Sequence, residues 1–541
     1  MSAPPRNGPR RRSVAAVAAV ALVLAALAGC SSGSSSTGLV DGAGTDTATE
    51  GGATGGGSAA GTLTVGLDSD PPGLDPAGNF LAISAFSIGN ALYDTLMAAP
   101  FDGPPQPRLA ESLTESADRL SWTLVVRDGV TFHDGTALDA AAVKLNLDRQ
   151  RASQLNGPSL SPITDVTVLD ERTVRIALSA PWTALPAVLA GTQGMVLSPT
   201  AIAAAGQDLA RAPVGAGTGP YRFVAWVPDD HLTVARNDAY WDGEPGFEEI
   251  VFRFLPDENA RLAAYQAGDV QLFTAALGET VDKAREADGG SGERVQVVEP
   301  PVAGQTVLYL NTVKAPFDDV RVRRAMLLAL DLDALAEAIG GSGYADYSWS
   351  VLPKDSPWYA PPTEPLRHDP DQARRLIADY EADTGRQVTF TYKALSTSQT
   401  FADAGRAYAA AWNDVGMDVD VENVADLTTL VLSMILRQYD VAGLVAGYYP
   451  DPDTVLFDLY HSGRTFNLSG FSDPRMDALL EQARASADPA ERKGLYAEVQ
   501  QLAREQLPLL NGNFGTVYLV GDADLTGVEP TGYFPARTIA R

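Results

Sequence analysis

The composition of the chain changes near residue 61, and this change separates a segment that cannot fold alone from a body that can. Of the 30 residues at 31–60, 25 are Gly, Ser, Thr or Ala, and none is aromatic. Such a segment buries too little apolar surface to fold, so we expect a flexible tether with a span of roughly 30 Å. The residues from 61 to 541 are numerous enough for two or three domains.

The segment before the tether has the features of an export signal. Arg10, Arg11 and Arg12 precede a run of 15 uncharged residues at 14–28, most of them Ala, Val or Leu. This length suits a secretory signal and is short for a membrane-spanning helix, which needs about 20 residues. The run ends in the sequence LAGC, and Cys30 is the only cysteine of the chain.

The sequence LAGC resembles the lipobox of bacterial lipoproteins, which implies cleavage before Cys30 and lipidation of its thiol. The alternative is an ordinary cleaved signal followed by an incidental cysteine. We therefore expect a lipoprotein signal peptide at 1–30, a tether at 31–60, and anchorage by lipid alone on the extracytoplasmic face of the cell membrane. The arginine run leaves open whether export follows the Sec or the twin-arginine route.

Charge and residue types exclude several classes of function. The net charge of −28 repels phosphate backbones, so we expect no nucleic-acid partner. The four histidines lie far apart in sequence and the single cysteine cannot form a metal cluster, so we predict no metal and no cofactor. No nucleophile-elbow motif occurs, and we predict no catalytic residue. A surface hydrolase is kept as the remote alternative.

Two short motifs mimic catalytic or nucleotide-binding sequences. FHDG at residues 132–135 is interpreted as a turn that ends a strand, because no second histidine stands at metal-binding spacing. GAGTGP at residues 215–220 lacks the Gly-Lys-Ser/Thr of a phosphate loop, and Pro220 removes a backbone donor. Both motifs therefore predict scaffold.

Strand and helix patterns mix along the body, which predicts an α/β fold without a repeat. Alternating apolar residues or short apolar runs predict strands within 63–67, 120–132, 163–178, 251–255 and 306–310. Helices are expected at 83–97, 138–151, 320–339, 475–485 and 490–504. Asp318 or Asp319, Asp473 and Asp488 stand at the starts of the last three helices and suit N-caps.

Several sequence blocks resemble the bacterial extracellular solute-binding proteins of family 5, which include oligopeptide, dipeptide and nickel receptors. The blocks occur in the family's order from about residue 62 to 510. They are NALYDTL at 90–96, PRLAES at 107–112, LVVRDGVTFHDG at 124–135, GTGPY at 217–221, NDAYW at 237–241, LNT at 310–312, PFDDVRVRRA at 316–325 and DPD at 451–453.

The resemblance implies a two-lobed periplasmic-binding-protein-like fold of the class II type, with a hinge that closes on a ligand. Lobe one is expected at 61–300 plus 510–541, with an inserted subdomain at 101–199. Lobe two is expected at 301–509. The implied function is that of a monomeric receptor which captures an extracellular solute and delivers it to the permease subunits of an ABC importer.

The segment GYYPDPD at 447–453 is the most informative one for ligand binding. Its adjacent tyrosines, Tyr448 and Tyr449, suit the lining of a cleft, although one ring in the core and one on the surface is the alternative. Asp451 and Asp453 suit turn formation better than ligand contact. The predicted ligand-binding residues are Tyr448, Tyr449, Phe466, Asn467, Asn79, Phe80, Tyr344 and Trp349.

Two departures from the family pattern bear on the ligand. Peptide receptors of the family commonly have an aspartate, for the ligand's α-ammonium, where this chain has Tyr448. Dipeptide receptors use an arginine in the stretch that here contains Ser396 and Thr397. A strict dipeptide receptor is therefore disfavoured, and few histidines disfavour nickel. We expect the ligand to be an oligopeptide that is held by its backbone. The alternative ligand is an oligosaccharide or another neutral polar solute. A surface receptor that does not take part in transport is a further possible class of protein.

Overall fold

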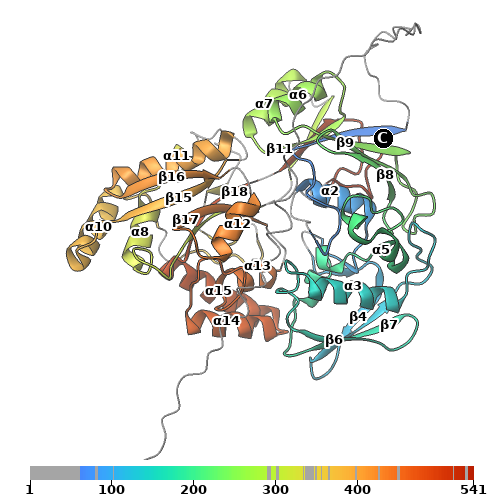
Figure 1. Ribbon diagram of the computed structural model, residues 1–541, viewed down its shortest axis with the longest axis horizontal. Helices are drawn as coiled ribbons and strands as arrows, with labels where there is room; N and C mark the ends of the chain where they lie inside the picture. Colours follow the sequence, from blue (N-terminus) through green and yellow to red (C-terminus); the bar gives the residue numbers. More distant parts are fainter. Residues whose placement is uncertain are drawn as a thin grey trace, which may run out of the picture. The chain divides into compact units, whose positions relative to one another are not determined.

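The computed structural model describes most of the body. The described residues are 61–78, 83–100, 103–288, 294–299, 304–332, 334–335, 346–347, 350–354, 356–362, 366–396, 399–424, 427–447, 451–515, 517–529 and 534–541. Among these residues, the strands form sheets of seven, six, four and two strands (Figure 1). The mixture of strands and helices confirms the predicted α/β class.

The seven-stranded sheet collects the first and the last strands of the chain. Its order is β12 (Val295–Val298), β19 (Tyr518–Asp522), β11 (Leu272–Ala275), β1 (Thr62–Leu67), β10 (Glu249–Phe254), β9 (His231–Arg236) and β8 (Tyr221–Val227). One face packs on α2 (Ile83–Leu92) and α5 (Pro199–Ala205), and the other on α6 (Glu258–Gln266) and α7 (Gly278–Ala287). Alternate residues of a strand point to opposite faces, which explains why Leu272 and Phe273 belong to different cores.

The six-stranded sheet is likewise covered on both faces. Its order is β14 (Asp346–Tyr347), β18 (Leu509–Gly515), β13 (Gly304–Leu310), β17 (Val441–Gly447), β15 (Thr389–Leu395) and β16 (Asp418–Val424). One core includes α8 (Val320–Leu328), α10 (Pro370–Thr384) and α11 (Gln399–Asp414). The other includes α12 (Leu427–Ile435), α13 (Asp453–Tyr460), α14 (Pro474–Ala485) and α15 (Pro489–Gln506) (Figure 1).

A smaller antiparallel sheet forms a separate core between β1 and β8 in the sequence. Its order is β4 (Ala110–Glu115), β5 (Ser121–Val126), β7 (Thr173–Leu178) and β6 (Ile163–Val168). It packs against α3 (Ala140–Ala152) and α4 (Leu185–Val188). The short pair β2 (Met97–Ala98) and β3 (Gln106–Pro107) precedes it, and the 3₁₀ helices η1 (Thr192–Gly194) and η2 (Gly206–Ala210) follow it. We refer to residues 103–199 of this unit as the inserted subdomain.

The helix starts follow the predicted caps. The side chain of Asp319 accepts from the backbone N–H of Arg321, that of Asp473 accepts from Arg475, and that of Asp488 accepts from Ala490. Helix ends were predicted less well. Helix α2 ends at Leu92 rather than at residue 97, and α8 ends at Leu328, short of the predicted 339.

A buried carboxylate explains why several sequence blocks stand where they do. Asp94 is fully buried, and its Oδ1 forms ion pairs with Arg108, at 2.8 Å, and Arg537, at 3.1 Å. Its carboxylate also accepts hydrogen bonds from Tyr240 Oη at 3.2 Å and Trp241 Nε1 at 2.9 Å. Burial alone raises the pKa of Asp94, but the two guanidinium groups and the hydrogen bond from Trp241 lower it below its ordinary value.

The glycines of GTGPY pack against the end of α2. A Cβ at Gly217 would lie 1.8 Å from the backbone oxygen of Leu92, and one at Gly219 would lie 2.5 Å from its carbonyl carbon. The backbone N–H of Gly219 donates to the same oxygen at 3.0 Å. The loop is therefore a close-packing element at the end of α2, which agrees with its interpretation as scaffold.

Removal of the charge on Asp94 should be strongly destabilising. Asp94→Asn leaves Arg108 and Arg537 beside a neutral amide, and breaking a buried ion pair on one side costs about 3–5 kcal/mol. Asp242, which pairs with Arg108 at 3.1 Å but is 47% exposed, provides the matched control. Asp242→Asn should cost at most about 1 kcal/mol. Urea unfolding measures both, and equal losses would contradict this role of Asp94.

Candidate functional site

The parallel strands of the seven-stranded sheet share one edge at their carboxyl ends. β1 runs parallel to β10 and β11, so Leu67, Phe254 and Ala275 end on the same side. The antiparallel strand β19 begins there, because Tyr518 pairs with Ala275. β12 ends there, because Val298 pairs with Leu519.

The six-stranded sheet has a corresponding edge. β13 begins at Gly304, which lies opposite Gly447 of β17 and Gly515 of β18. β15 runs parallel to both β17 and β16. The carboxyl ends of β15, β16, β17 and β18 therefore share one edge, and the short strand β14 pairs with β18 at Phe514 and Asn513.

The chain passes between the two sheets twice, at these edges. The first passage joins β12 to β13, and the second joins β18 to β19. Because β12 pairs with β19 and β13 pairs with β18, the start of each passage lies beside the end of the other. In open α/β sheets, ligands bind beyond the carboxyl ends of the strands. The paired edges are thus the candidate site.

Most residues predicted to bind the ligand lie outside the described residues: Tyr448, Tyr449, Asn79, Phe80, Tyr344 and Trp349, as does Cys30. The described neighbours of several of them are at the candidate site. Gly447, directly before Tyr448, ends β17 at this edge. Asp346 and Tyr347, between Tyr344 and Trp349 in the sequence, form β14 at the same edge.

The structure places Phe466 and Asn467 elsewhere. Asn467 is 2% exposed and lies in the loop after α13, where its carbonyl oxygen accepts from Arg437 Nη2 at 2.7 Å. Arg437 precedes β17, whose seven residues span about 20 Å. The Asn467 side-chain amide is bonded to backbone atoms of His461, Phe471 and Gly470. The structure therefore does not bring this loop to the edge where β17 ends.

Two ion pairs hold the segment that follows Tyr448 and Tyr449. Arg492 makes a two-pronged contact with the carboxylate of Asp451, at 2.8 and 3.0 Å. Arg484 Nε donates to both oxygens of Asp453, at 2.9 and 3.1 Å. Asp453 is 2% exposed and also accepts from Trp182 Nε1 at 2.9 Å. Both carboxylates are thus used within the protein, in accord with their interpretation as structural residues.

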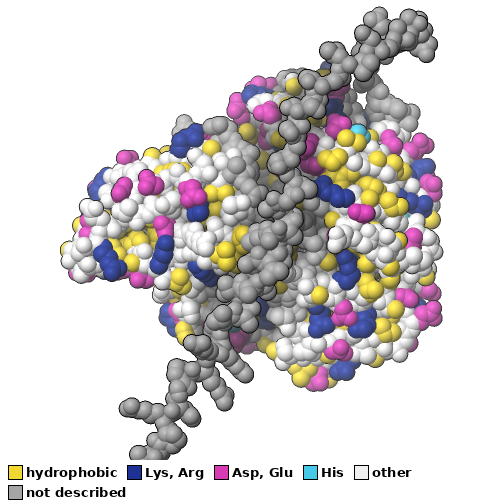
Figure 2. All heavy atoms as spheres, in the orientation of Figure 1, with side chains coloured by type: hydrophobic (Ala, Val, Ile, Leu, Met, Phe, Trp, Pro, Cys, Tyr) yellow, Lys and Arg dark blue, Asp and Glu magenta, His cyan; other side chains and the backbone are white. Residues whose placement is uncertain are grey.

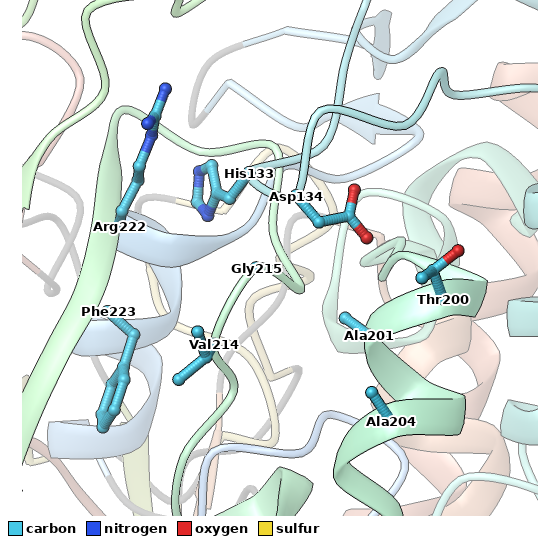
Figure 3. Close-up of a pocket in the computed structure, with 9 residues that line it drawn as sticks. All are labelled: His133, Asp134, Thr200, Ala201, Ala204, Val214, Gly215, Arg222 and Phe223. Atoms are coloured by element: carbon cyan, nitrogen blue, oxygen red, sulfur yellow. The ribbon is translucent and has the colours of Figure 1, made fainter.

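A surface hollow of about 340 Å³ lies at a different place, between α5 and β8 (Figure 3). Figure 3 shows Asp134 and Thr200 on one side and Arg222 and Phe223, from β8, on the other. Through successive strand pairs, Arg222 lies level with Thr62 at the start of β1. The hollow is therefore at the edge of the seven-stranded sheet opposite to the candidate site.

The polar groups around this hollow serve the scaffold. His133 Nε2 donates to the carbonyl oxygen of Gly219 at 2.9 Å, and Arg222 donates to Asn237 Oδ1 at 2.6 Å. Asp134 accepts from the N–H and hydroxyl groups of Thr136. Burial lowers the pKa of His133 to about 4, so its imidazole is neutral near pH 7. These contacts agree with the prediction that FHDG forms a turn.

The described residues lack two further kinds of feature. Across these residues, no helix has both the length and the apolar character needed to cross a bilayer. In the same part of the chain, no group of three or more His, Cys, Asp or Glu side chains is arranged to hold a metal ion.

Comparison with known proteins identifies the family. The sequence model of the bacterial extracellular solute-binding proteins, family 5 Middle, matches residues 104–467. The chain is a member of this family. A curated relative, the glutathione-binding protein GsiB of Pectobacterium atrosepticum, is 30% identical over 450 residues, which cover 77% of this chain and 85% of that protein. The chain is thus an extracellular solute-binding protein, as its sequence blocks indicated.

Solved structures of other proteins share its fold. The ABC transporter-associated periplasmic binding protein DppA from Helicobacter pylori, in complex with the peptide STSA, matches with a TM-score of 0.79 at 22% identity, covering 89% of this chain and 98% of that chain. AgaA in complex with agropinic acid, from A. tumefaciens R10, matches with a TM-score of 0.78 at 24% identity, covering 88% and 98%. The predicted fold class of this family 5 protein is confirmed.

Sequence reasoning missed the residues that fasten the segment 451–453. Arg484 lies in α14 and Arg492 in α15, where Arg492 is one of the buried residues of its helix. Trp182 is 271 residues away from Asp453 in the sequence. No local pattern marks such long-range partners. The paired Asp451 and Asp453 were the available signal, since closely spaced carboxylates next to apolar residues require partners.

His133 should make the stability of the protein depend on pH. Its folded-state pKa of about 4 lies below the ordinary 6.5, so the unfolded chain binds a proton that the folded chain does not. This stabilising contribution is complete above pH 6.5 and is lost as the pH falls toward 4. In His133→Gln this loss is absent, so its melting temperature should fall less steeply over that window than that of the wild type. Identical slopes in calorimetry would contradict the assignment.

Proposed function

We propose that this protein is the substrate-binding subunit of an ABC importer, and that it captures an oligopeptide by closing two lobes around it. The observation that carries the proposal is the meeting of strand ends from both large sheets at two side-by-side passages of the chain. Two adjacent passages permit rotation of one sheet unit against the other, as in other hinge proteins. We propose lobe one at 61–300 plus 510–541, with 101–199 inserted, and lobe two at 301–509.

Relatives of this protein support a peptide-like ligand. GsiB is named a glutathione-binding protein, and the DppA structure contains a peptide. The charges at the described part of the site add a constraint. Asp451 and Asp453 are already paired with Arg492 and Arg484, so they offer no free carboxylate to a ligand ammonium group. We therefore propose an oligopeptide that is recognised through its backbone and by aromatic stacking.

The same pairing favours a second candidate, a neutral polar solute such as an oligosaccharide. Aromatic rings and hydroxyl groups suffice to bind such a ligand. We propose Tyr448, Tyr449, Tyr344, Trp349, Asn79 and Phe80 as contacts for either ligand. For Phe466 and Asn467 we propose an indirect role, because their loop lies against the start of β17.

The proposed location is the extracytoplasmic face of the cell membrane, with Cys30 as the lipidated residue. β1 begins at Thr62 on the edge of its sheet opposite to the candidate site, so a tether that ends at residue 60 joins the body away from the ligand. We propose that the protein acts as a monomer with an importer permease and binds no nucleic acid. Figure 2 supports the last point, because acidic and basic side chains are interspersed on the face shown.

Loss of the paired tyrosine rings should weaken solute binding. Native mass spectrometry of the purified chain identifies a retained solute, and thermal shifts of peptides and oligosaccharides provide the fallback screen. With that solute, Tyr448→Ala together with Tyr449→Ala should weaken affinity about 10-fold or more, since each stacked ring contributes about 0.5–1.5 kcal/mol beyond its buried area. The corresponding double Phe variant keeps the rings and should retain most of the affinity. Unchanged affinity in the Ala variant would remove this assignment, and turnover of the solute would favour a hydrolase.

Lipidation has a direct test, because Cys30 is the only thiol of the chain. Cells that express the wild type in the presence of labelled palmitate should yield labelled protein of the mature size. Cys30→Ser should carry no label and should keep the mass of the uncleaved precursor, because both lipidation and lipoprotein cleavage require the cysteine. A labelled Cys30→Ser protein, or an unlabelled wild type, would show that the anchor has been assigned wrongly.

A further inference from the structure

A buried hydrogen bond joins the inserted subdomain to the helices of the six-stranded sheet. Trp182, from the loop between β7 and α4, donates from Nε1 to Asp453 Oδ2 at 2.9 Å. The two residues are 1% and 2% exposed. Trp182 belongs to the core of the inserted subdomain, whereas Asp453 is the first residue of α13. The bond therefore crosses between two units that have separate cores.

Arg484 completes the surroundings of this bond. Its guanidinium group pairs with the Asp453 carboxylate at 2.9 Å and lies over the ring of Phe457, 3.2 Å from the ring centre. It also lies 5.6 Å from the ring centre of Trp182. The carboxylate thus has one charged partner from its own unit and one neutral donor from the other unit. A charged acceptor makes the Trp182 bond stronger than a bond between neutral groups.

A second set of contacts joins the C-terminal end of α14 to the loop that contains Trp182. The carbonyl groups in the last turn of a helix have no partner within the helix. Here the backbone N–H of Thr183 donates to the carbonyl oxygen of Arg484 at 3.1 Å, and its hydroxyl donates to that of Ser486 at 2.8 Å. Arg119 donates to the hydroxyl of Thr183 at 2.6 Å and to the carbonyl oxygen of Ala485.

A third contact involves Arg464, which follows the C-terminal end of α13. Arg464 pairs with Asp458 at 2.6 Å on its own unit. It also reaches the inserted subdomain, where it donates to Ser161 Oγ at 2.9 Å and to the carbonyl oxygen of Pro158. Polar contacts from the inserted subdomain therefore occur along the length of α13, and none of them involves the two passages at which the sheets are connected.

We propose that these contacts form a closure latch, made of Trp182, Thr183 and Arg119 on the inserted subdomain and of Asp453 and residues 484–486 on the other unit. The passages between the sheets hold the units together at one place, and the latch fastens them at another. The donors belong to the inserted subdomain and the acceptors to the other unit, so a rotation that separates the units breaks the whole set together. Trp182 acts as the positioning residue, because it fastens the first residue of α13.

The functional consequence rests on the proposed function. If solute capture proceeds by closure of the lobes, the latch stabilises the closed form without touching the solute. It also holds residues 451–453, which follow the proposed contacts Tyr448 and Tyr449 directly in the sequence. The existence of the latch does not depend on any solute, and it can be tested without one.

Hydrogen exchange of the full-length, solute-free protein tests the latch directly. The Thr183 amide reports on it, because its acceptor is the Arg484 oxygen of the other unit. Trp182→Phe keeps an aromatic ring and removes the Nε1 donor. Loss of a hydrogen bond to a charged group should speed exchange of the Thr183 amide about 10-fold. The amides within β5 and β7 should exchange as in the wild type, which shows that the subdomain remains folded.

The chain offers a matched control in Trp122, on β5 of the same subdomain. Trp122 is 9% exposed, and among the described residues no acceptor lies within hydrogen-bonding distance of its Nε1. Trp122→Phe should leave exchange at Thr183 unchanged. Thr183→Val, which removes the hydroxyl that bridges Arg119 and Ser486, serves as a second latch variant and should accelerate exchange at residue 183 as well.

Two results would overturn the latch. One is a Thr183 amide that exchanges at the rate of an unprotected amide in the wild type. The other is unchanged exchange in both Trp182→Phe and Thr183→Val. Failure of the proposed function appears differently, because a protein that binds no solute in native mass spectrometry can still show Thr183 protection that depends on Trp182.

Discussion

The two passages of the chain between the large sheets are adjacent, and the placement of the candidate site follows from this constraint. β12 pairs with β19 in the seven-stranded sheet and β13 pairs with β18 in the six-stranded sheet, so the sheets are joined by two neighbouring segments. Because of their directions, the parallel strands of both sheets have their carboxyl ends at this junction. Any solute held there contacts both units, and its binding is coupled to their relative position.

The residues of the sequence blocks by which the family is recognised have a structural role and do not form the candidate site. Asp94 joins the blocks NALYDTL, PRLAES and NDAYW through Arg108, Tyr240 and Trp241, and the glycines of GTGPY pack on the end of α2. These contacts lie within the unit of the seven-stranded sheet and away from the strand ends of the candidate site. In such an arrangement the scaffold can stay the same while the residues at the strand ends differ.

The sequence was sufficient for predictions that depend on local chemistry. Asp319, Asp473 and Asp488 cap helices because a carboxylate accepts from the first free N–H groups, which is a local property. The early end of α2 was missed, because Asp94 leaves the helical pattern to meet Arg108 and Arg537, which are distant in the sequence. The position of the loop that contains Phe466 and Asn467 could not be derived from the sequence for a similar reason. Helix α13 leads the chain back along the sheet, so nearness to Tyr449 in the sequence does not bring Asn467 to the same edge.

Binding of solute at the strand ends of the two large sheets can be tested by hydrogen exchange of the full-length protein, measured as purified with its retained solute and again after the solute is removed by unfolding and refolding. We expect solute to slow exchange in residues 441–453 and 509–519, where β17, β18 and β19 meet the passages. Protection confined instead to residues 199–223, around the hollow between α5 and β8, would contradict it.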